Sequence, residues 1–240
     1  MKILGVIPAR YASTRLPGKP LIDIGGKSMI RRVYEQAQKA VQLEDVIVAT
    51  DDERICDEVR SFGGNVLMTS ANHQNGTERC AEVLDLMRSD AEVIINIQGD
   101  EPFIHPQQID TLAALFENKS CSIGTLIRRC DDMALLERPS IIKATVDIHF
   151  KALYFSRSLI PFQRNDNGIT PFYKHIGIYG YRADILRELV KLKPSPLELC
   201  ESLEQLRWLE NGYNVHTALT DHESISVDVP EDVERIIDFL

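Results

Sequence analysis

The chain has 240 residues, of which 44% are hydrophobic and 26% are charged, a composition typical of a globular protein with a sizeable core. Its 36 acidic residues outnumber its 27 basic residues and give a formal net charge of -9. This balance argues against a general nucleic-acid binder, because such proteins carry a broad basic face. We therefore expect no nucleic-acid partner, and any anionic ligand must be bound by a local group of cations.

The cysteines and the apolar runs predict a cytoplasmic protein. The five cysteines are scattered and form no Cys-x-x-Cys pair, so the sequence predicts neither a disulfide framework nor a zinc site. The first apolar run, at 3–7, is too short for the core of a signal peptide, and no segment approaches the length of a membrane span. We expect no membrane partner.

The first half of the chain alternates short apolar runs with longer amphipathic stretches. The expected strands lie at 3–7, 46–49, near 66 and at 93–97. The expected helices lie at about 29–40, 52–62, 77–88 and 106–116. Alternation of this kind predicts a mainly parallel sheet covered by helices.

The second half of the chain is richer in expected strands. They lie at 122–128, 141–147, 152–160 and 173–182, with no long helix among them, and we interpret them as an antiparallel insertion at about 120–182. A helix is expected at about 197–211, with a buried stripe formed by Leu199, Leu203, Leu206 and Leu209. Strands near 214–219 and 225–227 and a last helix from about Pro230 follow. The fold class is α/β, with residues 1–240 forming a single domain.

The loop at 8–20, directly after the first expected strand, is the most informative segment. It carries Arg10, Arg15 and Lys19, and no acidic residue occurs from Met1 to Ile22. Arginine forks bind phosphate oxygens two at a time, and lysine offers a compact positive charge. The loop therefore predicts a polyanion site, with a solvated basic turn as the alternative from charge alone.

Acidic residues follow other expected strands. In a parallel sheet, ligands bind outside the carboxyl ends of the strands, so the basic loop, 50–52 and 98–102 should open onto one edge. Gly99 permits a sharp turn that aims the Asp100 carboxylate into the cleft. Mg²⁺ takes one or two carboxylates together with phosphate oxygens, so Asp100 would need a partner, for which Asp228 is a candidate. Asp51 and Asp228 are equally suited to cap the helices that follow them.

One glycine-rich stretch is similar to a nucleotide-binding motif but does not match it. Gly25-Gly26-Lys27-Ser28 looks like the end of a P-loop, but the position where the P-loop needs its first glycine holds Leu21. The Gly-x-Gly-x-x-Gly fingerprint is also absent from the first strand-helix turn. These departures argue against a P-loop nucleotidase and a dinucleotide oxidoreductase, and they predict a tight turn at Gly25-Gly26.

The motifs together resemble those of the sugar-activating cytidylyltransferases, and most closely the 3-deoxy-manno-octulosonate (Kdo) cytidylyltransferase family. The resemblance covers essentially the whole chain. Its most specific segments are Phe155-Ser156-Arg157, His175-Ile176-Gly177-Ile178-Tyr179 and Glu204-Gln205-Leu206-Arg207. It also includes the loop at 8–20, Ala49-Thr50-Asp51, His73-Gln74-Asn75-Gly76-Thr77-Glu78-Arg79, Gln98-Gly99-Asp100-Glu101-Pro102 and Val227-Asp228-Val229-Pro230.

The resemblance implies a three-layer Rossmann-like nucleotidyltransferase fold. In this family the anomeric hydroxyl of Kdo attacks the α-phosphorus of CTP, which gives CMP-Kdo and pyrophosphate for lipopolysaccharide biosynthesis. The implied catalytic residues are Arg10, Arg15 and Lys19, which hold the triphosphate, and Asp100 and Asp228, which bind Mg²⁺. The other implied CTP contacts are Ala9, Asp51, Gly76, Thr77, Arg79 and Gln98. The implied sugar contacts are Arg157, His175, Tyr179, Glu204 and Gln205, and a homodimer is implied as well.

These implied roles make chemical sense, although alternatives remain. Arg157 and His175 suit the sugar's carboxylate, and Glu204 and Gln205, off the leucine stripe, suit its hydroxyls. A solvated helix face is the other interpretation of Glu204 and Gln205. His175 and Tyr179 should share one face of a strand, which could equally be a core layer.

The sequence departs from the family at one position and leaves two other functions open. Where the family usually has Pro-Asn-x-Val-Lys, the chain has Ser140 in place of the asparagine, which bears on a local turn and on fine substrate preference. A cytidylyltransferase for a related acid sugar, such as the 8-amino analogue of Kdo, is one alternative. A non-catalytic protein that binds CTP is the other.

Overall fold

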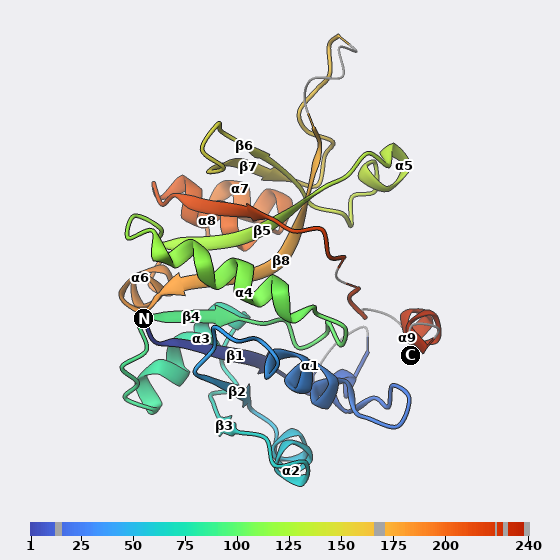
Figure 1. Cartoon of the computed structure of the whole chain (residues 1–240), viewed down its shortest axis with the longest axis vertical. Coiled ribbons are helices and arrows are strands. Elements are labelled where there is room, and N and C mark those ends of the chain that lie inside the picture. Colours follow the sequence, from blue (N-terminus) through green and yellow to red (C-terminus); the bar gives the residue numbers. More distant parts are fainter. Residues whose placement is uncertain (13–15, 166–170, 224, 228–229, 238–240) are drawn as a thin grey trace.

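A computed structural model of the chain describes residues 1–12, 16–165, 171–223, 225–227 and 230–237 (Figure 1). The strands are β1 (Ile3–Ala9), β2 (Asp45–Thr50), β3 (Val66–Met68), β4 (Val93–Asn96), β5 (Ile123–Arg129), β6 (Lys143–Val146), β7 (Ala152–Ser156), β8 (Tyr173–Arg182) and β9 (Val215–Leu219). The α-helices are α1 (Met29–Ala37), α2 (Glu53–Ser61), α3 (Gly76–Leu86), α4 (Pro106–Ala114), α5 (Met133–Leu136), α6 (Ala183–Leu189), α7 (Pro196–Glu201), α8 (Glu204–Glu210) and α9 (Pro230–Ile237). Two short 3-10 helices are η1 (Lys19–Leu21) and η2 (Leu115–Glu117).

The described strands form one mixed sheet. Its main path runs in the order β3-β2-β1-β4-β8-β5-β9. The neighbours from β3 to β4 are parallel, β8 is antiparallel to both β4 and β5, and β5 is parallel to β9. The β6 strand pairs antiparallel with β7 and with the start of β8. The predicted α/β class, a mainly parallel sheet with antiparallel strands, is confirmed.

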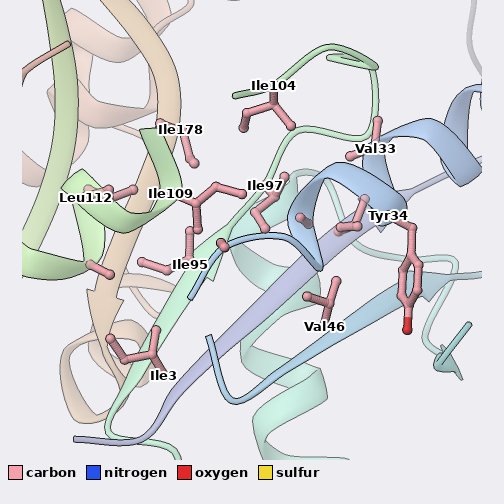
Figure 2. Close-up of a cluster of buried hydrophobic side chains, with 14 of the residues drawn as sticks. Ile3, Val33, Tyr34, Val46, Ile95, Ile97, Ile104, Ile109, Leu112 and Ile178 are labelled. Atoms are coloured by element: carbon pink, nitrogen blue, oxygen red, sulfur yellow. The ribbon is translucent and has the colours of Figure 1, made fainter. Parts of the chain in front are cut away.

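Helices cover both faces of the sheet because residues in each strand alternate between them. In β1, Ile3 and Ile7 join a buried cluster with side chains of α1, α2 and α4. Figure 2 shows part of this cluster, in which Ile95 of the sheet lies near Ile109 of α4. Leu4 and Val6 point to the other face and pack with α3, α6 and α8. The result is three layers, with the β6–β7 pair at one end of the molecule (Figure 1).

The prediction of one continuous helix at 197–211 is wrong, because the structure has two helices there. The helical stretch is broken at Ser202, whose φ of 52° and ψ of 50° are left-handed, and the two pieces are α7 and α8. The predicted leucine stripe is accordingly wrong in part, since Leu199 is 69% exposed whereas Leu203 and Leu206 are buried. A non-glycine residue in this conformation gives no sequence signal as clear as glycine or proline would.

Three other details differ from the sequence-based expectations. The α6 helix was not predicted, and residues 225–227 form no strand. Within 120–182, β5 and β8 lie on the main path of the sheet, and β6 and β7 branch from it through the pairing of β6 with β8. The grouping of 120–182 as one insertion therefore stays a prediction.

The turn at Gly25-Gly26 and the last helix agree with the predictions. Both glycines have positive φ, of 59° and 81°. The α9 helix begins at Pro230, and its Ile236 packs with Ile24, Met29 and Val227. Among the described residues, no helix is both long enough and apolar enough to cross a bilayer.

Candidate active site

A cavity of about 270 Å³ lies where β1 and β4 end and α3 begins. Seven of the predicted site residues line it: Ala9, Arg10, Lys19, Gly76, Arg79, Gln98 and Asp100. The prediction that the basic loop and the segment after β4 open onto one edge is therefore confirmed. The third predicted segment, 50–52, does not line this cavity, and Thr77 does not line it either.

Glycines allow the walls of the cavity to approach each other closely. A Cβ atom on Gly99 would lie 2.8 Å from the Pro8 carbonyl oxygen, which real Cβ atoms do not tolerate. Gly76 is similarly crowded, because a Cβ atom there would lie 3.2 Å from the Asn96 side-chain nitrogen and 3.3 Å from the Pro8 ring. Gly99 thus serves a close approach of two strand ends, a reason different from the sharp turn that the sequence suggested.

Contacts hold the basic loop on both sides of residues 13–15, which lie outside the described residues. The Gly18 amide donates a hydrogen bond to the Tyr11 carbonyl at 3.0 Å, and Gly18 has a φ of 70°. The Arg54 guanidinium lies over the Tyr11 ring, 3.3 Å from its centroid, and is itself held by two bonds to the Asp52 carboxylate at 2.9 and 2.7 Å. Arg15 lies outside the described residues.

Lys19 and Asp100 form an ion pair inside the cavity. The Lys19 ammonium lies 2.7 Å from Asp100 Oδ2, with side-chain exposures of 13% and 32%. Lys19, the proposed phosphate-binding cation, is therefore in direct contact with Asp100, the proposed metal-binding carboxylate. Each side chain neutralises the charge of the other.

The donor set around Asp100 suits a hard divalent cation that is also bound by phosphate oxygens. Among the described residues, no group of three or more His, Cys, Asp or Glu side chains could hold a metal by itself. Asp228 lies outside the described residues, but the amide of its neighbour Val227 donates to the Asp100 carbonyl at 3.0 Å. The chain therefore reaches Asp100 one residue before Asp228. A carboxylate beside a phosphate-sized cavity fits Mg²⁺, which favours oxygen ligands and retains phosphate oxygens.

Arg79 is buried, with 4% exposure, and reaches the cavity wall from α3. Its Nη1 donates to Thr69 Oγ1 at 2.5 Å, and its Nη2 lies 3.6 Å from Asp51 Oδ2. Asp51 thus contacts a residue of the cavity wall without lining the cavity itself. The expectation that Asp51 caps the next helix is wrong, because the cap of α2 is Asp52, whose carboxylate accepts the Arg54 amide.

Four of the predicted sugar residues are covered by the rest of the chain: His175, Tyr179 and Gln205 are buried, and Glu204 is half-buried. The Thr77 hydroxyl, one residue after Gly76, donates to Glu204 Oε2 at 3.0 Å. Burial raises the pKa of the Glu204 carboxyl to about 7, an effect that the Thr77 hydrogen bond only partly offsets. Gln205 is 6% exposed and follows on the same helix, so the idea that these two side chains occupy a solvated face is wrong.

His175 and Tyr179 share one face of β8, as predicted. Their ring centroids are 5.3 Å apart, and His175 also packs edge-on against Phe155 at 5.0 Å. The His175 ring lies 2.9 Å from the Thr125 hydroxyl. Burial lowers the pKa of His175 to about 3, so its imidazole is neutral at pH 7 and offers hydrogen bonds without a positive charge.

Arg157 is held by a different set of contacts. Its guanidinium donates to the carbonyls of Glu201 at 2.6 Å, Pro139 at 3.0 Å and Ser202 at 3.3 Å. The Glu201 carboxylate in turn accepts the Ser156 hydroxyl at 2.6 Å and the Arg157 amide at 2.8 Å. Arg157 therefore joins the loop that contains Ser140 to the end of α7. None of the five predicted sugar residues lines the cavity.

Six cavity residues were not predicted as site residues: Pro8, Pro20, Gly99 and the consecutive residues His73, Gln74 and Asn75. The three consecutive residues form one wall of the cavity, next to Gly76. They lie between β3 and α3, and the end of a parallel strand was the signal that could have indicated them.

The fold has three layers, and a basic loop and a carboxylate lie at the carboxyl ends of the central strands of its sheet. This arrangement is that of a nucleotidyltransferase. Residues 4–225 match the family described as Cytidylyltransferase. The chain is 50% identical to the 3-deoxy-manno-octulosonate cytidylyltransferase of Bacteroides thetaiotaomicron, with 100% of this chain and 98% of the relative covered. It is 48% identical to the protein of the same name from Geobacter sulfurreducens, with both chains fully covered. The chain belongs to the 3-deoxy-manno-octulosonate cytidylyltransferase family.

Solved structures agree with this assignment. The structure of a CMP:2-keto-3-deoxy-manno-octonic acid synthetase complexed with CTP superposes with a TM-score of 0.94 at 41% identity, covering 100% of this chain and 98% of that one. A cytidylyltransferase from Leptospira borgpetersenii, at 17% identity and a TM-score of 0.66, covers 100% of this chain and 88% of that one and shares the fold.

Proposed function

We propose that the protein transfers CMP from CTP to Kdo and releases pyrophosphate. The observation that carries this proposal is the cavity at the ends of β1 and β4, lined by the basic loop and Asp100 in a chain about half identical to named Kdo cytidylyltransferases over its full length. The related synthetase with a TM-score of 0.94 was solved with CTP. CTP is thus the nucleotide that we assign to this cavity.

Charge is the main physical problem of this reaction. A triphosphate with about four negative charges must meet an anionic sugar, and the α-phosphoryl group must be attacked. Arg10 and Lys19 line the cavity where the triphosphate would lie, and Arg15 belongs to the same loop. We assign the three cations to triphosphate binding, and we assign Gly76, Arg79 and Gln98 to the nucleoside side of the cavity.

Mg²⁺ is the metal that we propose for the site, with Asp100 and Asp228 as its protein ligands. Bound there with phosphate oxygens, the ion would supply electrostatic stabilisation of the phosphoryl group. The contact between Val227 and Asp100 supports this pairing, because it brings the chain next to Asp100 just before Asp228. Asp100 and Asp228 would hold the ion, and Lys19, which lies 2.7 Å from Asp100, would bind phosphate oxygens beside it.

For the sugar, we propose the region around Glu204, Gln205, His175 and Tyr179, with Arg157 beside it. The Thr77–Glu204 hydrogen bond supports this placement, because it joins the helix that starts at the nucleotide cavity to the helix that carries Glu204 and Gln205. A cytoplasmic location and a homodimer complete the proposal. The strand-rich region at 120–182 would form the dimer surface, since it exposes Ile148 at 90% and Phe162 at 89%.

One assay tests the reaction. CTP, Mg²⁺ and a panel of acid sugars that includes Kdo, its 8-amino analogue and a sialic acid are scored for pyrophosphate release, with UTP and ATP as nucleotide controls. We expect release with CTP and Kdo. Release with UTP alone would contradict the cytidine assignment, and tight CTP binding without turnover of any sugar would indicate a non-catalytic CTP-binding protein.

The metal assignment has its own test. Asp100→Asn keeps the shape of the side chain but removes a charged oxygen ligand, and we expect metal-dependent turnover to fall by at least about 100-fold. Asp90→Asn is the matched control, because Asp90 pairs with Lys2 at the surface, where β1 and β4 begin, whereas the cavity lies where these strands end. Full activity of Asp100→Asn would refute the assignment.

A further inference from the structure

The cavity wall formed by His73, Gln74 and Asn75 belongs to no strand or helix, although Asn75 caps α3 by accepting the Glu78 amide at 2.8 Å. These residues lie in the stretch at 69–75, between the end of β3 and the start of α3. A loop that must present a fixed surface to a ligand needs other partners, because an unordered wall loses conformational entropy on binding. The neighbouring helix supplies those partners.

Two carboxylates of α3 bind this loop. Glu82 Oε2 accepts the Ser70 amide at 2.8 Å and lies 2.6 Å from His73 Nε2. Glu78 Oε2 accepts the Gln74 amide at 2.8 Å and lies 3.6 Å from His73 Nδ1. The His73 ring is thus held between two carboxylates that lie four residues apart on the helix and therefore on one face of it.

These carboxylates hold the wall without lining the cavity. His73 lines it, whereas neither Glu78 nor Glu82 does. This placement matters because a carboxylate facing the cavity would repel a triphosphate. The hydrogen bonds that hold Glu82 lower its pKa although burial acts in the opposite direction, so the group is an anion at neutral pH.

We propose that Glu82 is a positioning residue of the nucleotide site, which acts through His73 to fix the wall of the cavity and thereby sets the affinity and selectivity for CTP. The inference rests on the proposed function, since it takes CTP as the ligand of the cavity. It concerns the nucleotide and leaves the sugar site unaffected.

The test is Glu82→Gln, with Asp85→Asn as the matched control. Asp85 lies on the same helix, and its carboxylate forms an exposed ion pair with Arg187 at 3.0 Å, away from the loop. Both variants remove one negative charge from α3. We expect Glu82→Gln to raise the KM for CTP about tenfold, which corresponds to about 1.4 kcal/mol, and to lower the preference for CTP over UTP. We expect kcat, the KM for the sugar and the melting temperature to stay close to those of Asp85→Asn.

A double variant tests whether the effect passes through His73. In the His73→Ala background, Glu82→Gln should change the KM for CTP much less than it does in the wild type. Full additivity, an unchanged KM for CTP, or an equal change in the KM for the sugar would each overturn the inference.

Calorimetric titration of CTP separates this inference from the proposed function. Wild-type protein that fails to bind CTP would refute the proposed function itself. Wild-type protein that binds CTP, together with a Glu82→Gln variant that binds it equally well, would refute only the positioning role.

Discussion

The buried Glu204 carboxyl should make the stability of the protein depend on pH in an unusual direction. Replacing it by Glu204→Gln keeps the size of the side chain and an oxygen that can accept the Thr77 hydroxyl. Burial raises the pKa of Glu204 from 4.5 to about 7 in the folded protein, whereas the unfolded chain keeps the ordinary value. The variant removes this difference between the two states.

The sign follows from which state loses its proton first. Below about pH 4.5 the carboxyl is protonated in both states, and it makes no pH-dependent contribution. As the pH rises from there to about 7, the unfolded chain ionises while the folded protein stays protonated, so the free energy of unfolding falls. Above pH 7 the loss is complete, and at 1.36 kcal/mol per pKa unit it amounts to about 3 kcal/mol at most.

Chemical unfolding of the ligand-free protein between pH 5 and pH 8 measures this effect. We expect Glu204→Gln to exceed the stability of the wild type by less than about 1 kcal/mol at pH 5, where the unfolded carboxyl has begun to ionise, and by up to about 3 kcal/mol at pH 8. Glu198→Gln is the control of opposite sign: burial raises the pKa of Glu198, but its two bonds from Arg207 outweigh this and lower it, so the variant should lose stability at pH 8. A Glu204→Gln variant that is no more stable than the wild type at pH 8 would refute the reasoning.

Two further predictions concern the basic loop and the cysteines. Arg54→Ala removes the guanidinium over the Tyr11 ring, so we expect the KM for CTP to rise about two- to fivefold. Arg60→Ala, on the same helix, is the control, and an equal rise in both variants would show that Arg54 does not hold the basic loop through Tyr11. Cys200 is the exposed cysteine and the other four are buried, so a maleimide should label one thiol of the folded protein rapidly, and Cys200→Ser should abolish that labelling; rapid labelling of the serine variant would show that a buried thiol is accessible.

The sequence was sufficient to predict that the basic loop and the segment after β4 meet at one cavity. Arg10, Lys19, Gln98 and Asp100 each follow a strand of the parallel part of the sheet, and the ends of such strands meet at one edge whatever the details of packing. The pairing of Lys19 with Asp100 was not predictable, since it depends on how a turn after Gly18 is oriented.

The surroundings of the proposed sugar residues were harder to predict, because they depend on tertiary contacts. That His175 and Tyr179 share a face follows from the period of a strand, but the neutral state of His175 follows from burial among rings that come from distant parts of the chain. The helix break at Ser202 and the burial of Gln205 have the same origin. The spacing of hydrophobic residues predicts the buried face of one segment, but it does not predict which other segments pack against that face.

The break at Ser202 separates two tasks that a continuous helix would couple. Glu201, on one side of it, binds the start of the segment after β7, and Glu204, on the other side, reaches α3. A substitution in α8 can therefore change the contact of Glu204 with Thr77 while the bonds of Glu201 to Ser156 and Arg157 stay in place. In the proposed sugar site, the break at Ser202 would thus let the surroundings of Glu204 change without loosening the attachment of α7.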